Sequence, residues 1–253
     1  MVPRMSDPDE NEPRRLDVEL VRRGLAPSRA AARASIEAGK VTVGGATALK
    51  VGQLVRGDAT IEAEPAHPWV SRGGLKLAHA LDVFGVDPVG QMCLDVGAST
   101  GGFTDVLLSR GARRVVAVDV GTAQLNAKLR TDPRVTSLET TDSRALSLDL
   151  IGERPTLIVC DLSFISLAKA LGPVLALAAG ETTLVGLFKP QFEVGPSRVS
   201  KGGIVTDRVA AEEAAGDFET WLGSAGWKVS GWTASPILGG DGNEERLFCA
   251  RNY

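Results

Sequence analysis

Cys93-Leu94-Asp95-Val96-Gly97-Ala98-Ser99-Thr100-Gly101-Gly102-Phe103-Thr104-Asp105-Val106-Leu107-Leu108 is the stretch of this 253-residue chain that decides its fold. A short apolar run ends at an acidic residue and a glycine-rich turn, and a helical apolar pattern begins at Phe103. This order predicts a strand, a tight loop and a helix. Gly97 and Gly101 leave free the space that a Cβ would occupy, so the backbone can approach a ligand closely.

A second apolar strand, Val115–Val118, follows and ends at Asp119. A carboxylate at the end of a second strand is placed to bind both ribose hydroxyls of a nucleoside. A nicotinamide site would carry G-x-G-x-x-G, whereas this loop has the form D-x-G-x-x-x-G-G. That form resembles the S-adenosylmethionine loop of class I methyltransferases; the alternative is a glycine-rich turn without a ligand. The residues expected to bind S-adenosylmethionine are Asp95, Gly97, Ala98, Ser99, Thr100, Gly101, Gly102, Phe103, Asp119, Asp142 and Asp161.

The composition narrows the class of protein without fixing a partner. There are 28 Lys and Arg residues against 31 Asp and Glu, and the net charge of −3 leaves the chain weakly acidic. Local clusters of basic residues matter more for nucleic-acid binding than this sum does. The three cysteines lack metal-ligand spacing and lie in or beside apolar runs, which is typical of reduced, buried thiols. With no signal peptide and no apolar run of about 18 residues, we expect a soluble, cytoplasmic, metal-free monomer.

The N-terminal part of the chain predicts a small separate domain. Residues 1–13 are polar and proline-containing, which favours a disordered tail. Residues 14–64 predict a compact α+β unit with two short helices, the second capped by Ser28, followed by short strands. Residues 65–71 contain two prolines and a tryptophan and are expected to form an interdomain linker.

The pattern R-L-D-x-x-L-x-x-x-G-L-x-x-S-R-x-x-A-x-x-x-I-x-x-G-x-V-x-V-x-G in this unit resembles the S4 domain, an RNA-binding module. Its basic residues outnumber its acids, which favours contact with phosphates; the alternative is a solvated basic face. The residues expected to contact RNA are Arg14, Arg15, Arg22, Arg23, Arg29, Arg33, Lys40 and Arg72. Arg198 and Lys201 are further candidates for phosphate contact.

The remaining chain, residues 72–253, alternates strand and helix patterns. Strands are expected at Val135 and at residues 157–160, 183–188, 227–234 and 246–250, and helices at residues 125–129, 167–179 and 212–225. Repeated β-α units predict a doubly wound, mostly parallel α/β sheet of the Rossmann-like, class I methyltransferase type. Asp95, Asp119, Asp161 and Lys189 all fall at carboxyl ends of strands, where such sheets bind ligands. Asp142, after the third strand, is expected to face the adenine.

The residues after the fourth strand narrow the methyl acceptor. Amino methyltransferases that act on bases carry a D/N-P-P-Y/F turn, whereas residues 161–166 read D-L-S-F-I-S. Carbon-5 methylation of pyrimidines needs an exposed cysteine, and Cys160 is expected to be buried. A hydroxyl acceptor needs a base within hydrogen-bond reach. Phe164, Phe188 and Phe192 are expected in the core, with stacking on a flipped base as the alternative.

The complete set of motifs resembles the TlyA (hemolysin A-like) family of rRNA 2′-O-methyltransferases, whose catalytic domain is FtsJ-like. The motifs are S-R-G-G-x-K-L, D-V-G-A-S-T-G-G-F-T-D, D-L-S-F-I-S, L-F-K-P-Q-F-E-V-G, K-G-G-I-V, S-P-I-x-G and G-N-x-E. The K-D-K-E tetrad of that family corresponds to Lys76, Asp161, Lys189 and Glu245. Taken singly, Lys76 would be expected to reach solvent.

The resemblance implies S-adenosylmethionine-dependent methylation of a ribose 2′-OH in rRNA, on a cytidine. It implies Lys189 as the base for the hydroxyl, with Lys76 and Asp161 positioning it and Glu245 completing the hydrogen-bond set. Because the chain ends soon after Glu245, large-subunit rRNA is the expected substrate. The alternatives are a non-catalytic RNA-binding factor for ribosome assembly and a membrane-lytic hemolysin.

Overall fold

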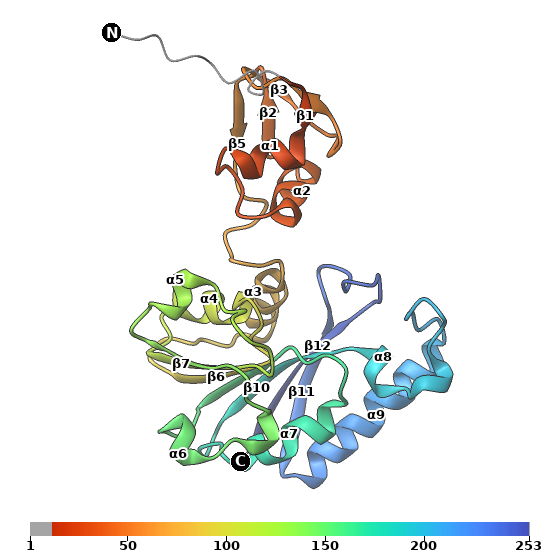
Figure 1. Cartoon of the computed structure of the whole chain (residues 1–253). Coiled ribbons are helices and arrows are strands. Elements are labelled where there is room, and N and C mark those ends of the chain that lie inside the picture. Colours follow the sequence, from red (N-terminus) through yellow and green to blue (C-terminus); the bar gives the residue numbers. More distant parts are fainter. Residues whose placement is uncertain (1–11, 253) are drawn as a thin grey trace. The chain divides into compact units, whose positions relative to one another are not determined.

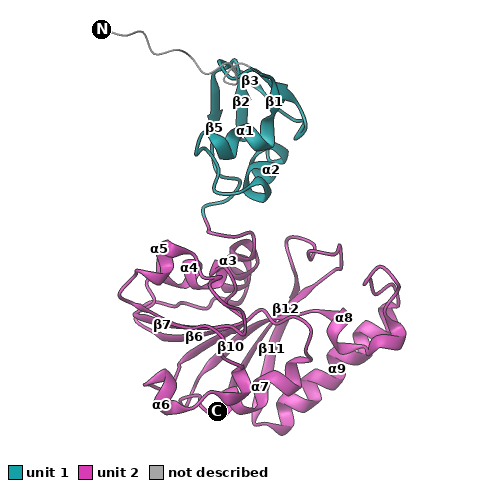
Figure 2. Ribbon diagram, in the orientation of Figure 1, with its two compact units in different colours: residues 1–68 teal, residues 69–253 magenta. Residues whose placement is uncertain are grey.

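Residues 12–252 are described by the computed structural model. They separate into two compact units, of which the first ends at Pro68 and the second begins at Trp69 (Figure 2). The predicted linker, residues 65–71, contains this division. The predicted disordered tail, residues 1–13, lies outside the described residues apart from its last two positions.

The first unit is a small α+β module. Its elements are β1 (Arg14–Arg15), α1 (Leu16–Arg22), α2 (Arg29–Glu37), β2 (Val41–Val43), β3 (Ala46–Thr47), β4 (Leu54–Val55) and β5 (Ile61–Ala63). β2 pairs antiparallel with β3 and β5, and β1 pairs antiparallel with β4. Leu16 and Leu20 of α1 pack with Ile36 of α2 in one apolar core. The backbone N–H of Ala31 donates to Ser28 Oγ at 3.2 Å, which confirms Ser28 as the N-cap of α2.

The second unit is built around a seven-stranded sheet. Its elements are α3 (Gly73–Phe84), β6 (Met92–Val96), α4 (Gly102–Ser109), β7 (Arg114–Val118), α5 (Ala127–Arg130), β8 (Val135–Leu138), η2 (Ser143–Ala145), α6 (Leu148–Ile151), β9 (Leu157–Cys160), α7 (Leu167–Leu175), β10 (Thr183–Phe188), α8 (Pro190–Glu193), η3 (Pro196–Arg198), α9 (Arg208–Ser224), β11 (Trp227–Ala234) and β12 (Arg246–Asn252). The strand order is β11-β12-β10-β9-β6-β7-β8, and only β12 runs antiparallel to its neighbours. The predicted doubly wound, mostly parallel sheet is confirmed.

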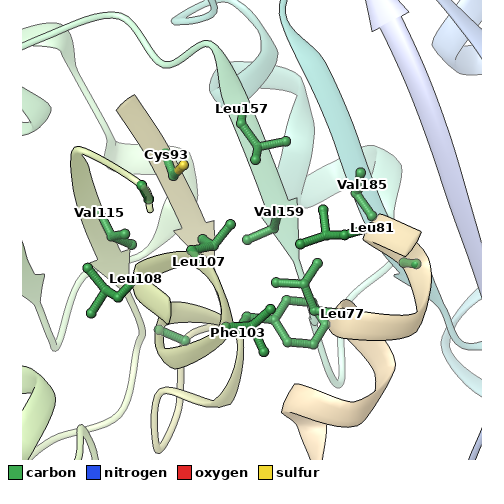
Figure 3. Close-up of a cluster of buried hydrophobic side chains, with 14 of the residues drawn as sticks. Leu77, Leu81, Cys93, Phe103, Leu107, Leu108, Val115, Leu157, Val159 and Val185 are labelled. Carbon is green, nitrogen blue, oxygen red and sulfur yellow. The ribbon is translucent and has the colours of Figure 1, made fainter. Parts of the chain in front are cut away.

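Apolar side chains cover both faces of this sheet. α3, α4 and α5 lie on one face, and α6, α7 and α9 lie on the other (Figure 1). Leu77 and Leu81 from α3 meet Phe103 and Leu107 from α4 over Val159 of β9 (Figure 3). Because helices bury the strands from both sides, the central strands carry continuous apolar runs instead of alternating ones.

The order of the strands places an open crevice at the end of β6. From β6 the chain passes to β7 and β8 on one side, and later crosses to β9 on the other side. The loops that follow β6 and β9 therefore diverge, and ligands bind at such a reversal in parallel sheets. Asp119 and Asp161 follow β7 and β9, and Lys189 follows β10, so these predicted residues share this edge.

Several predicted element bounds are wrong, and local capping explains two of them. The helix expected at residues 125–129 is found at residues 127–130, as α5. The Glu139 carboxylate accepts hydrogen bonds from the backbone N–H groups of Ala123, Gln124 and Leu125, which holds these residues in a loop. The last long helix begins at Arg208 instead of residue 212, because the Asp207 side chain caps its first turn. α7 ends at Leu175, four residues earlier than predicted. The short strands β1 and β3 were not predicted.

Two general features of the described residues bear on function. None of their helices combines the length and the apolar character that a membrane crossing requires. Within the same residues, no group of three or more His, Cys, Asp or Glu side chains is arranged to hold a metal ion.

Candidate active site

The glycine-rich loop after β6 is shaped by its close neighbours. Gly97 has φ +86°, and a Cβ there would lie 2.5 Å from the backbone oxygen of Asp161. The backbone N–H groups of Gly97 and Ala98 both donate to Val118 O, which ties the loop to the end of β7. Gly97 is therefore required by the approach of β9 as well as by its backbone conformation.

Asp119 is held in place by backbone donors from two loops. Its Oδ2 accepts from Ser99 N at 2.8 Å, and its Oδ1 accepts from Gly121 N at 2.7 Å. Each carboxylate oxygen keeps further acceptor capacity. Asp119 is thus fixed at the end of β7 with its oxygens available to a pair of ribose hydroxyls.

A cavity of about 450 Å³ lies over the ends of β6, β7 and β9. Five of the residues predicted to bind the cofactor line it: Gly97, Ser99, Asp119, Asp142 and Asp161. A second cavity of about 140 Å³ is lined by Ser71, Arg72, Gly73, Lys76, Gly97, Ala98, Ser99, Thr100, Gly102, Phe103 and Asp161. The two cavities share Gly97, Ser99 and Asp161, so they adjoin at the ends of β6 and β9.

Asp142 lines the first cavity as an ion-paired carboxylate. The Arg144 side chain donates to both of its oxygens, at 2.9 Å and 2.6 Å. The hydrogen bond from this side chain is the main reason that the pKa of Asp142 is lowered to about 2. Asp142 therefore presents a charged acceptor to any ligand in the cavity.

Asp95 and Gly101, also predicted to contact the cofactor, line neither cavity. Asp95 is fully buried, and its Oδ2 accepts from Thr104 Oγ1 at 2.6 Å. Burial raises the pKa of Asp95 to about 7; the Thr104 hydrogen bond opposes this shift and the charge of Asp161 adds to it. The structure places Asp95 behind the loop, where it fixes the first turn of α4.

Lys76 and Glu245 form a buried ion pair. Lys76 lies on α3 and donates from Nζ to Glu245 Oε2 at the start of β12. Only 7% and 3% of the two side chains are exposed. The expectation from local sequence that Lys76 reaches solvent is wrong, because a carboxylate 169 positions away in the chain compensates its charge.

Lys189 and Asp161 form a second pair beside the cavities. Lys189 Nζ lies 2.5 Å from Asp161 Oδ1 and donates to Ser163 Oγ at 2.8 Å. Their side chains are 11% and 23% exposed, so this pair is less enclosed than Lys76 and Glu245. The four predicted tetrad residues thus form two lysine–carboxylate pairs. Ser163 was not singled out from the sequence, because a serine beside a strand end carries no pattern of its own.

Phe164 does not belong to the core, contrary to prediction. It is 91% exposed, has φ +66°, and lines the larger cavity. The centroid of its ring lies 5.2 Å from the ring centroid of Phe192, a residue of α8. Phe188 is fully buried, as expected. An exposed aromatic ring in a left-handed backbone conformation is uncommon, and it points to a role other than packing.

The cysteines are excluded as nucleophiles by their surroundings. Cys93, Cys160 and Cys249 are all buried free thiols. Burial raises the pKa of Cys93 to about 12 and that of Cys160 still higher. The prediction that Cys160 is buried is therefore confirmed.

Comparison with known proteins identifies the family. The FtsJ-like methyltransferase model matches residues 69–252, and the S4 domain model matches residues 14–61. The "16S/23S rRNA (cytidine-2′-O)-methyltransferase TlyA" of Mycobacterium tuberculosis is 47% identical over 239 residues, which cover 94% of this chain and 89% of that protein. The chain belongs to the TlyA family of FtsJ-like methyltransferases.

Two other similar proteins carry the name hemolysin. "Hemolysin A" of Brachyspira hyodysenteriae is 39% identical, with 92% of this chain and 98% of that protein covered. The solved structure "Putative hemolysin from Streptococcus thermophilus" is 37% identical and matches with a TM-score of 0.74, covering 95% of this chain and 88% of that one.

The S4 domain of this TlyA-family chain holds most of its predicted RNA-contacting residues in ion pairs. Asp17 is buried between Arg15 and Arg29, and Glu19 is buried between Arg22 and Arg23. Arg33 pairs with Glu37 and Lys40 pairs with Glu64. In the second unit, Arg72 donates to Leu238 O at 3.4 Å and lines the smaller cavity.

Each buried acid of the S4 domain is outnumbered by its arginines. Arg22 and Arg23 hold Glu19 at 2.6 Å each, and Arg15 and Arg29 hold Asp17 at 3.0 Å and 2.7 Å. Two guanidinium groups around one carboxylate leave a net positive charge in a fixed place. This arrangement suits recognition of a phosphate backbone without flexible side chains.

Proposed function

We propose that this TlyA-family protein transfers a methyl group from S-adenosylmethionine to the 2′-OH of a cytidine in rRNA. The observation that carries the proposal is the pair of lysine–carboxylate contacts, Lys189 with Asp161 and Lys76 with Glu245, beside a nucleoside-sized cavity. Such a site supplies groups for proton transfer, whereas the buried cysteines supply no nucleophile. The name of the Mycobacterium tuberculosis relative, an rRNA (cytidine-2′-O)-methyltransferase, supports this substrate.

The residues around the two cavities fit S-adenosylmethionine. The larger cavity, about 450 Å³, has carboxylates at Asp119 and Asp142, which suit ribose hydroxyls and the exocyclic amine of adenine. The acidic surroundings, including Asp161, suit a sulfonium cation. The smaller cavity offers the Ser71 hydroxyl and the Arg72 guanidinium to the amino-acid end. When bound, S-adenosylmethionine supplies an electrophilic methyl group.

Lys189 is proposed as the base. Lys189 Nζ would take up the proton of the ribose 2′-OH, and bound S-adenosylmethionine would supply the methyl group that the 2′-oxygen accepts. A lysine can accept a proton only as the neutral amine. Asp161 and Ser163, both in contact with Nζ, orient that nitrogen. Lys76 lines the smaller cavity and is paired with the buried Glu245, so this pair would shape the amino-acid end of the site.

Phe164 is proposed to stack on the base of the target nucleotide. A ribose in folded RNA is reached most easily when its nucleotide is turned out of the stack, and the exposed base then needs an apolar platform. The Phe164 ring is exposed at the cavity edge and is supported from behind by Phe192. The arginine pairs of the S4 domain would bind phosphates of the rRNA, and we expect the reaction to take place in the cytoplasm, where rRNA is found.

The test combines binding with turnover. Calorimetry with S-adenosylmethionine should show one site per chain, and Asp119→Ala should weaken it because the ribose contacts are lost. Tritium from the labelled methyl group should then pass to ribosomal subunits taken from a bacterium without a gene of this family. Absence of cofactor binding would instead favour a non-catalytic assembly factor. Leakage of liposomes at micromolar protein, without methyl transfer, would favour a membrane-lytic role.

A further inference from the structure

Asn243 lies in the loop between β11 and β12, two residues before Glu245, and it is 1% exposed. Both polar ends of its side chain bond to the backbone of a distant segment. Val205 N donates to Asn243 Oδ1 at 3.0 Å, and Asn243 Nδ2 donates to Gly203 O at 2.8 Å. The side chain therefore ties residues 203–205 to the loop that carries Glu245.

The same loop is closed around the Glu245 carboxylate. Gly239 N donates to Asn243 O at 2.9 Å, and Ser235 N donates to Glu245 O at 3.0 Å. A Cβ on Gly239 would lie only 2.6 Å from Glu245 Oε1. The Asn243 backbone oxygen and the Glu245 carboxylate thus both lie against Gly239, so a shift of Asn243 is expected to move the glycine against which Glu245 packs.

We propose that Asn243 is a positioning residue for the proposed methyl transfer: it fixes the loop that holds Glu245 against Lys76. The inference rests on the proposed function, because its effect on turnover requires that the Lys76–Glu245 pair serve the reaction. Asn243 lines neither cavity, and its side chain is hydrogen-bonded to Val205 N and Gly203 O instead of to a lysine of the two pairs. Its effect should therefore pass through Glu245, and displacement by a fraction of an ångström is enough to slow an oriented reaction.

Asn252 provides a matched control at the other end of β12. Thr182 N donates to Asn252 Oδ1 at 2.5 Å, and Asn252 Nδ2 donates to Ala179 O at 2.9 Å. The side-chain amide bridges two backbone groups in the same manner as Asn243, but at the end of β12 that lies beside the start of β10, away from Lys189. Asn252→Ala should weaken folding by the loss of two hydrogen bonds without changing turnover.

The experiment measures the full-length protein with labelled S-adenosylmethionine and ribosomal subunits under saturating conditions. Asn243→Ala should lower kcat about 10- to 100-fold, while the Kd for S-adenosylmethionine stays within about twofold. In a Glu245→Gln background the same substitution should lower kcat less than about twofold, because residues that act as a unit are not additive. Asn252→Ala should leave kcat within about twofold in both backgrounds.

Amide hydrogen exchange gives a readout that does not depend on activity. Asn243→Ala should speed exchange both at residues 203–205 and at residues 235–245, and Asn252→Ala should do neither. The inference is overturned if Asn243→Ala keeps the kcat of the wild type, or if it lowers kcat equally with and without Glu245. If the wild type transfers no methyl group, the proposed function fails, and unchanged exchange at residues 235–245 in Asn243→Ala would then overturn the positioning role separately.

Discussion

The two units of this protein bury carboxylates in the same way but pair them with different cations. In the S4 domain, Glu19 is held by Arg22 and Arg23. In the methyltransferase unit, Glu245 forms its ion pair with Lys76. Arginine stays charged and makes forked contacts, whereas lysine is a single point charge that can give up a proton. This difference is consistent with the two proposed roles, binding of phosphates by the first unit and proton transfer in the second.

The strongest test of this comparison replaces a lysine with an arginine. Lys189→Arg keeps the positive charge beside Asp161 and removes a nitrogen that can release its proton. We expect kcat to fall about 10³-fold, the range typical of a lost general base, with the affinity for S-adenosylmethionine within about twofold. Single-turnover transfer of labelled methyl to ribosomal subunits measures it. Turnover near the wild-type level would show that Lys189 contributes charge alone.

The buried ion pair of Lys76 and Glu245 should contribute to both turnover and folding. Glu245→Gln leaves the Lys76 ammonium buried without its anion. We expect the free energy of unfolding to fall by about 3 kcal/mol. We also expect kcat to fall about 10- to 100-fold through misplaced groups. Urea unfolding and the same transfer assay measure the two effects. An unchanged stability would contradict the burial of this pair; Glu244→Gln, on an exposed neighbour, is the control.

The reverse replacement, of an arginine by a lysine in the S4 domain, tests the proposed binding of rRNA. In the wild type, Arg29 Nε and Nη2 both donate to Asp17 Oδ2. Arg29→Lys keeps the charge near Asp17 but loses this two-donor contact. If Arg29 contacts a phosphate, rRNA affinity should fall up to about tenfold, since a hydrogen bond to a charged group contributes about 1.5 kcal/mol. Filter binding at fixed salt measures it. Arg56→Lys, in an exposed pair with Asp58, should bind as the wild type does.

Asp95 lacks the cationic partner that the paired acids have, and its pH dependence should have the opposite sign. Its pKa is raised from 3.8 to about 7 by burial. The folded protein therefore holds this proton more tightly than the unfolded chain, and stability falls as pH rises from about 4 to about 7. Asp95→Asn should gain stability over the wild type at pH 8 and lose that advantage at pH 4. Thermal unfolding without cofactor measures the gap; an equal gap at both values would contradict it.

Loss of the Glu19 charge should have the smallest effect on stability among these predictions. The hydrogen bond from Arg22 is the main reason that its pKa is lowered from 4.5 to about 2. The stabilisation is therefore complete above about pH 4.5 and is lost as pH falls toward 2. The stability advantage of the wild type over Glu19→Gln should shrink across that range. Hydrogen exchange in α1 measures it within the S4 domain, and a pH-independent advantage would argue against ionic pairing.

Much of the fold follows from local patterns in the sequence. The loop at Gly97 to Gly101, the acid at Asp119 and the repeated β-α units specify a parallel sheet and its ligand edge, because glycine conformation and apolar periodicity are local properties. The start of the helix near Leu125 could not be predicted from the sequence, because the Glu139 carboxylate holds these residues in a loop. That contact depends on tertiary packing.

The candidate site was predictable as a set of residues but not as pairs. Spacing alone does not reveal that Lys76 meets Glu245, because the partners come from α3 and β12. Phe164 was expected in the core because phenylalanine is usually buried; in the folded loop after β9 its backbone is left-handed and its ring is exposed. Ser163 and Asn243 have no sequence pattern, since their roles depend on contacts made in three dimensions.

Identification of the product tests the central claim most directly. Ribosomal subunits from a bacterium without a gene of this family would be incubated with the full-length protein and S-adenosylmethionine, and the rRNA digested to nucleosides for mass spectrometry. We predict new 2′-O-methylcytidine, with its amount strongly reduced for Lys189→Arg. A methyl group on the cytosine base, or equal 2′-O-methylcytidine from wild type and Lys189→Arg, would contradict the assignment of Lys189 as the base for a ribose hydroxyl.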